Sequence, residues 1–216
     1  NRVYDNDVDT GFVAEFVTVT FPKPGRWIEA GWLKKHGENK AQFYVAWQIA
    51  PSGFHIEYKG DAPYNPSHNY KIYEPDYTWL VYIDGNLVKS LQPEWPEGKL
   101  YTESETEDSA DPPVNELEGH FWDLKRYSSS SGWQLWDDIF TFADPPYKAL
   151  ELKDHEFATG GPYCELKAET SMGQALEDPN DGNSVILVPV VIERIKDPNG
   201  QTVSRDITKY RAIASY

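Results

Sequence analysis

The sequence is nearly without sulfur, since only one of its 216 residues is cysteine and only one is methionine. The single cysteine, Cys164, cannot form an intrachain disulfide or build a thiolate metal cluster. No apolar run approaches the roughly 20 residues of a membrane-spanning helix. Basic residues are also scarce, because 20 Lys and Arg stand against 35 Asp and Glu, for a net charge of −15. This charge repels phosphate backbones and anionic lipid, so we expect neither nucleic acid nor a membrane surface as a partner.

Common catalytic and cofactor motifs are absent as well. The chain has no glycine-rich phosphate loop, no HExxH, no GxSxG and no CxxC. Its histidines lie singly, without the spacing of paired metal ligands. The Asp-rich stretch at 178–183 lacks the pattern of an EF-hand calcium loop. We therefore predict a protein that uses no metal and no other cofactor.

The chain does contain many aromatic residues and many short alternating runs. Phe, Trp and Tyr make up 14% of the sequence, and such residues suit pleated surfaces and concave binding faces. Alternation between turn residues predicts strands at 12–21, 27–33, 42–49, 54–58, 69–73, 79–83, 87–91, 99–107, 121–127, 133–142, 149–157, 163–170, 185–195 and 202–216. Asp84-Gly85 between two apolar runs indicates a β-hairpin.

These strand runs recur at short intervals, and no segment has a convincing helical period. We expect an all-β protein, an antiparallel two-sheet β-sandwich of the jelly-roll or concanavalin-like kind. No repeat or linker divides the chain, so residues 1–216 are expected to form a single domain and a monomer.

Acidic residues on two predicted strands are the candidates for chemistry. In the run Trp27-Ile28-Glu29-Ala30-Gly31-Trp32, alternation places Glu29 beside Trp27 and Gly31, on the face opposite Ile28. The glycine leaves room for something to approach. The run 101–107 likewise places three glutamates on one face. Most glutamates of half-exposed strands face solvent, so this pattern alone favours solvated outer faces.

These runs resemble the glutamic peptidase sandwiches, namely the eqolisins, the plant neprosins and neprosin-like bacterial proteins. The resemblance rests on short segments: Gly11-Phe12-Val13-Ala14 to Phe21-Pro22, Trp27 to Trp32, 43–47, 69–72, 79–85, 105–108 and Phe121. It implies a sandwich-shaped endopeptidase whose catalytic residues are Glu29 and Glu105. It also implies a secreted protein, and we expect its signal peptide or propeptide to be absent from this chain.

Two glutamates in one concave site would share a proton, because like charges disfavour each other at short range. Under this interpretation Glu105 is the base that activates water against a peptide carbonyl. Protonated Glu29 donates to the developing oxyanion and then helps to protonate the leaving amine. The substrate is an extended peptide or protein lying across the sheet. The residues expected to bind it are Trp27, Trp47, Glu57, Tyr58 and Trp79.

The chain departs from the family pattern at several points. Eqolisins carry Gln where this chain has Glu29, so the closer resemblance is to neprosin-like proteins. The bacterial relatives are expected to carry an acidic residue where Ala46 stands, and Glu57 is the candidate to replace it. The segment 141–172 has no counterpart that can be placed. Rival positions for the second acid are Glu103, Glu165 and Glu169.

Two other functions fit the same pattern. A jelly roll with an aromatic concave face and two glutamates is also the plan of carbohydrate-cleaving or carbohydrate-binding sandwiches that act on polysaccharides. No ExDxE motif supports that alternative here. The other alternative is a non-catalytic binding module that has lost the site, which Ala46 and the segment 141–172 favour. Because fold does not decide among these functions, the placement of Glu29 relative to Glu105 becomes the discriminating observation.

Overall fold

The computed structural model describes residues 8–49, 53–64, 66–93, 95, 98–108, 115–136, 140–144, 147–153, 156–160, 194–196, 202–204 and 208–215. Across these residues the chain forms strands and no helix, and every strand pair is antiparallel. The prediction of an all-β antiparallel sandwich is confirmed. In the same residues, no helical segment combines the length and apolar character that a bilayer crossing requires.

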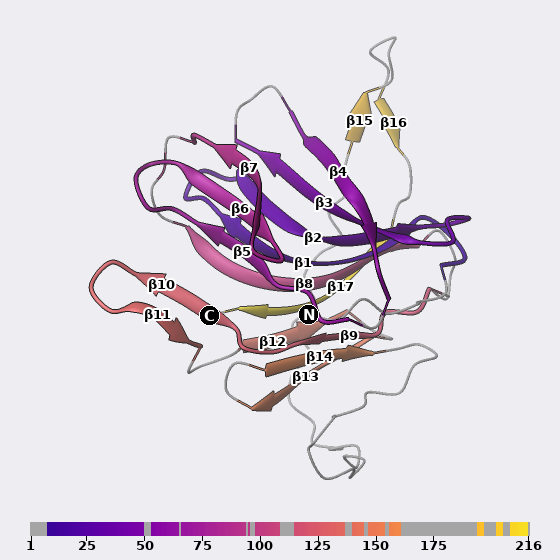
Figure 1. Ribbon diagram of the computed structural model, residues 1–216. Helices are drawn as coiled ribbons and strands as arrows, with labels where there is room; N and C mark the ends of the chain where they lie inside the picture. Colours follow the sequence, from indigo (N-terminus) through magenta and orange to yellow (C-terminus); the bar gives the residue numbers. More distant parts are fainter. Residues whose placement is uncertain are drawn as a thin grey trace.

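A seven-stranded sheet forms the body of the molecule (Figure 1). Its strands, in spatial order, are β12 (Phe140–Ala143), β17 (Thr208–Ser215), β8 (Lys99–Asp108), β1 (Phe12–Thr20), β2 (Trp27–Lys35), β3 (Ala41–Gln48) and β4 (His55–Ala62). The central strand β1 therefore has β2 on one side and β8, more than eighty residues later in the chain, on the other.

Smaller sheets complete the structure. One contains β5 (Tyr70–Tyr73), β6 (Trp79–Ile83) and β7 (Asn86–Leu91), and it lies beside β1, β2 and β3 in Figure 1. A second contains β13 (Lys148–Lys153), β14 (Glu156–Gly160) and β9 (Gly119–Phe121). Two hairpins, β10 (Lys125–Ser128) with β11 (Gly132–Leu135) and β15 (Arg194–Lys196) with β16 (Thr202–Ser204), account for the remaining strands.

One face of the large sheet packs against the sheet of β5 to β7 and against the sheet that contains β9 and β14, and we call it the core face. Alternation along β1 sends Val13 and Val19 to this face, where they join buried residues of β2, β3, β6, β9 and β14. The opposite face is also substantially buried, because Ala14, Phe16 and Tyr44 form a third cluster there with Leu33 and Ala46. Both faces of β1 to β3 are therefore rich in apolar residues.

Several predicted single strands are wrong, because each of these runs holds parts of two strands. The run 121–127 is divided between β9 and β10, and Asp123 lies at the break with a left-handed φ of 54°. The run 149–157 is a hairpin of β13 and β14, and the runs 133–142 and 202–216 each hold two separate strands. The predicted strand at 163–170 and nearly all of the one at 185–195 lie outside the described residues.

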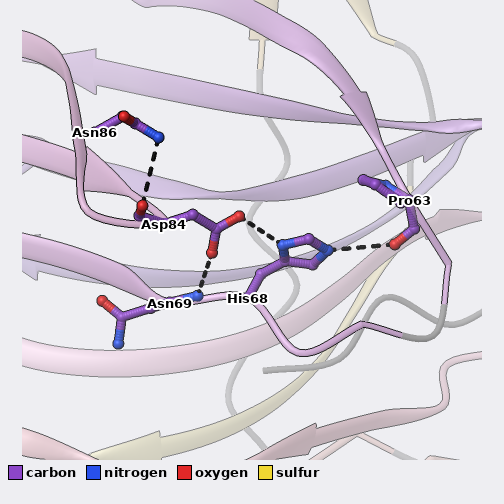
Figure 2. Close-up of polar contacts among 5 residues, drawn as sticks. All are labelled: Pro63, His68, Asn69, Asp84 and Asn86. Atoms are coloured by element: carbon purple, nitrogen blue, oxygen red, sulfur yellow. Dashed lines mark hydrogen bonds and ion pairs between the residues drawn. The ribbon is translucent and has the colours of Figure 1, made fainter.

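The predicted Asp84-Gly85 hairpin is present between β6 and β7, with φ of 50° at Asp84 and 77° at Gly85. Such positive values at both central positions match the twist of the flanking strands. The Asp84 carboxylate also accepts hydrogen bonds from the Asn69 backbone N–H at 2.8 Å and from Nδ1 of His68 at 2.7 Å (Figure 2). Nε2 of His68 lies 3.3 Å from the Pro63 carbonyl oxygen. The turn therefore holds the loop that enters β5.

Candidate functional site

The strand register brings the candidate acids to one face of the large sheet. Glu29 of β2 lies opposite Thr18 of β1, while Glu105 of β8 lies opposite Ala14. Partners in an antiparallel ladder project to the same side, as do alternate residues of one strand. Glu29, Glu103 and Glu105 therefore share the face opposite the core face, and we call it the acid face.

The room that the sequence predicted beside Gly31 is filled by the backbone of β1. Gly31 lies opposite Phe16 on β1 and opposite Tyr44 on β3. A Cβ atom at Gly31 would lie 2.6 Å from the Cα of Phe16 and would collide with the backbone carbonyl oxygen of Glu15. The Tyr44 ring packs edge-on against Phe16, with 6.4 Å between ring centroids. Glycine is thus required at position 31 for the close approach of β1 and β2.

Tyr44 of β3 shares this face, and its phenol interacts with all three glutamates. Burial raises the pKa of Tyr44 well above its ordinary value, and the negative charges of Glu29 and Glu105 raise it further. A hydrogen bond to Glu29 and the charge of Glu103 act in the same direction. The phenol therefore stays neutral across the physiological range and donates a hydrogen bond to the Glu29 carboxylate.

The two proposed catalytic glutamates are not direct cross-strand neighbours. They lie on either side of β1 with an offset of four residues along it, which places their Cα atoms roughly 16 Å apart in a flat sheet. By register alone, Glu103 is nearer to Glu29. The charge of Glu105 nevertheless acts on the Tyr44 phenol more strongly than that of Glu103. The position of the carboxylate, rather than that of the Cα atom, decides the chemistry, and the stronger effect of Glu105 on Tyr44 therefore favours Glu105 as the second acid.

The acids differ in exposure. Glu103 and Glu105 are buried, with 8% and 7% of their surfaces exposed, whereas Glu29 is half-buried. Carboxylates at this depth are held in place by their surroundings and feel neighbouring charges strongly. The pair therefore combines one enclosed acid with one that has more access to solvent.

Two of the predicted substrate-binding residues share the acid face. Trp27 lies two residues before Glu29 on β2, and its ring lies 5.8 Å from that of Phe54. Tyr58 of β4 lies opposite Tyr44, is 39% exposed, and has the Lys35 ammonium 4.6 Å from its ring centroid. Trp27 and Tyr58 thus lie on the side of the sheet where a substrate of the acid pair would bind.

Two other predicted contacts lie elsewhere. Trp47 and Trp79 are buried in the core between the large sheet and the sheet of β5 to β7. The Trp79 indole N–H donates to the Trp95 carbonyl oxygen at 2.8 Å, so its polar atom is satisfied inside the protein. The structure does not bring these two tryptophans to the acid face.

Glu57 does not replace the acid expected at Ala46. It lies opposite Val45, a residue of the core face, whereas Ala46 lies opposite Glu29. Hydrogen bonds from Lys59 and Lys89 lower the pKa of Glu57, with Lys59 Nζ 2.7 Å from its Oε2. Glu57 is therefore the ionised partner of two lysines, Lys59 and Lys89. The rival acids Glu165 and Glu169, like Cys164, lie outside the described residues.

The sequence analysis did not single out Tyr44. The sequence did hold a signal for Tyr44, because alternation in the run Phe43-Tyr44-Val45-Ala46-Trp47 puts Tyr44 and Ala46 on one face of the strand and the other three residues on the opposite face. What the alternation could not supply was the register that sets Ala46 opposite Glu29. Among the described residues, no group of three or more His, Cys, Asp or Glu side chains is arranged to hold a metal ion.

Comparison of the chain with protein-family models, with curated proteins and with solved structures finds no match. A functional assignment must therefore rest on the acid face and its chemistry.

Proposed function

We propose that this protein is an acid-acting endopeptidase that activates water with Glu29 and Glu105. The observation that carries the proposal is the strand register, which puts Glu29, Glu105 and Tyr44 on one face of the large sheet, where the charges of both acids act on the Tyr44 phenol. The proposed mechanism requires one of the two carboxyl groups to be protonated while the other is ionised. The resemblance to glutamic peptidases supports the same assignment. The proposed enzyme is secreted and monomeric and needs no cofactor.

The reaction needs a base and a proton donor on opposite sides of the scissile bond. Glu105 takes a proton from water as the water oxygen forms a bond to the peptide carbonyl carbon. Protonated Glu29 donates a hydrogen bond to the oxygen on which negative charge develops. When the C–N bond breaks, a proton passes to the leaving amine, and the pair again holds a single proton.

Tyr44 acts in this scheme as a positioning residue. Its neutral hydroxyl donates to Glu29 and so fixes the side chain that must face the substrate carbonyl. Trp27 and Tyr58 lie on the same face, and both are accessible enough to contact an extended peptide. The apolar surface that they provide is compatible with an extended polypeptide as the substrate.

The purified protein should cleave denatured protein substrates in acid and lose most of that activity near neutrality. The reason is that one carboxyl group must be protonated for the pair to act, and a rising pH ionises both. The measurement is the release of peptides from a denatured protein between about pH 2 and pH 7, the range over which coupled carboxyl groups titrate. Chelators and reagents against thiols or serine hydroxyls should leave the rate unchanged.

Absence of proteolysis over that whole range would remove the peptidase proposal. Release of reducing sugar from a polysaccharide, with no peptide release, would instead assign the same acids to glycoside cleavage.

A further inference from the structure

A cavity of about 250 Å³ opens on the core face, on the other side of the large sheet from the acids. Its floor includes Val17, Val19 and Leu100 of strands β1 and β8. One wall is the start of β5 with the residues before it, 68–72. The other wall is the segment 121–125 together with Trp133 and Trp136. The cavity thus lies between elements of two covering sheets.

The lining combines aromatic rings with hydrogen-bonding side chains on both walls. The aromatic members are Tyr70, Phe121, Trp122, Trp133 and Trp136, and the polar members include Asn69, Asp123 and Lys125. Asn69, Asp123 and Lys125 are exposed, so their side chains can hydrogen-bond the polar groups of a ligand. The Tyr70 hydroxyl is buried and makes no hydrogen bond within the described residues, so it too can receive a polar ligand or a water.

An exposed aromatic platform continues from the mouth of the cavity. Trp133 is 46% exposed and Tyr127 is 43% exposed, although both rings are large. Their centroids lie 5.5 Å apart, and each ring also contacts Tyr73, at 5.7 Å and 4.8 Å respectively. Adjacent exposed aromatic rings at the edge of a cavity indicate a surface that binds something.

One wall of the cavity is held in place without a ligand. His68 and Asn69 both line the cavity, and both are bonded to the Asp84 carboxylate in the turn between β6 and β7 (Figure 2). A binding site formed before the ligand arrives avoids the entropy cost of ordering a loop.

We propose that this cavity binds one ring of a neutral hexose saccharide, with further rings passing over the exposed platform. A pyranose ring has an apolar C–H face that stacks on an indole and a rim of hydroxyl groups that bond to amide and charged side chains. The cavity volume is below the roughly 300–1,000 Å³ of sites for drug-sized ligands, which suits a single ring. The overall charge of −15 disfavours acidic polysaccharides. This site is separate from the acid face and does not depend on the proposed peptidase activity.

Calorimetric titration of the intact chain with cellohexaose, laminarihexaose and mannohexaose tests this proposal. At least one of the three should bind. The Trp133→Ala variant should bind it at least about tenfold more weakly, as expected for loss of an aromatic anchor. Leu135→Ala is the matched control, because Leu135 is 43% exposed on the same strand but does not line the cavity, and its affinity should be unchanged.

Two further titrants separate the rival occupants, polygalacturonate for an acidic polysaccharide and a Phe-containing tripeptide for a peptide side chain. The proposal is overturned if none of the three neutral hexasaccharides binds at millimolar concentration, or if Trp133→Ala binds as well as the parent. The proposal is also overturned if polygalacturonate or the tripeptide binds more tightly than every neutral hexasaccharide and Trp133→Ala loses that binding. The cavity would then be assigned to that ligand class.

Discussion

Replacing Glu105 with glutamine is expected to lower the rate of acid proteolysis by at least about a hundredfold, as for loss of a general base. An amide cannot accept a proton from water, although it fills nearly the same volume as the carboxyl group. The fold should persist, because Glu105→Gln keeps the side-chain length on β8. The measurement is kcat/KM on one peptide substrate at acid pH, with circular dichroism to show that the variant is folded.

Glu103→Gln is the matched control for this experiment. Glu103 is on the same strand and the same face as Glu105 and has nearly the same exposure, 8% against 7%. We expect it to retain most of the activity. If Glu103→Gln loses the activity while Glu105→Gln keeps it, then Glu103 is the second acid.

The second large effect is expected at Gly31, where an added methyl group should destabilise the protein by roughly 3 kcal/mol or more. In Gly31→Ala the new Cβ atom would meet the backbone of β1 at Glu15 and Phe16. Backbone atoms in the middle of a sheet cannot move aside as the end of a flexible side chain can. The free energy of unfolding, measured by urea denaturation, should therefore fall sharply.

Gly37→Ala provides the comparison that isolates this collision. Gly37 has a left-handed φ of 76° and no atom within 4 Å of an added Cβ, so only backbone strain of about 1 kcal/mol is expected there. A loss of stability in Gly31→Ala no greater than that in Gly37→Ala would contradict the close approach of β1 and β2.

The strands that could be predicted are those with local signals. The run 79–83 agrees with β6 residue for residue, and the Asp84-Gly85 turn is where the dipeptide indicated. The break within 121–127 could not be predicted, since no glycine or proline adjoins Asp123 to mark the turn there. The pairing of β1 with β8 was also beyond reach, because a pattern gives the parity of each strand but not its spatial neighbours.

Because a pattern gives parity but not spatial neighbours, only some of the site residues were assigned to the correct face. Parity within each run put Glu29 with Trp27 and Glu103 with Glu105, and the register then brought both pairs to one face. Trp47 was misplaced because β3 is apolar on both sides. With Val45 and Ala46 both buried, alternation cannot tell which face packs against the second sheet.

The most direct measurement of the proposed pair is a double-mutant cycle on Glu29 and Glu105. Glu29→Gln should keep partial activity, because an amide can still donate a hydrogen bond to the oxyanion, and Glu105→Gln should keep almost none. If the two acids act as one unit, the double variant should be no slower than Glu105→Gln alone, since catalytic groups that work together are not additive. Values of kcat/KM for the four proteins, on one peptide at one acid pH, provide the test. Losses that multiply in the double variant would contradict the pair and show that the two glutamates act independently.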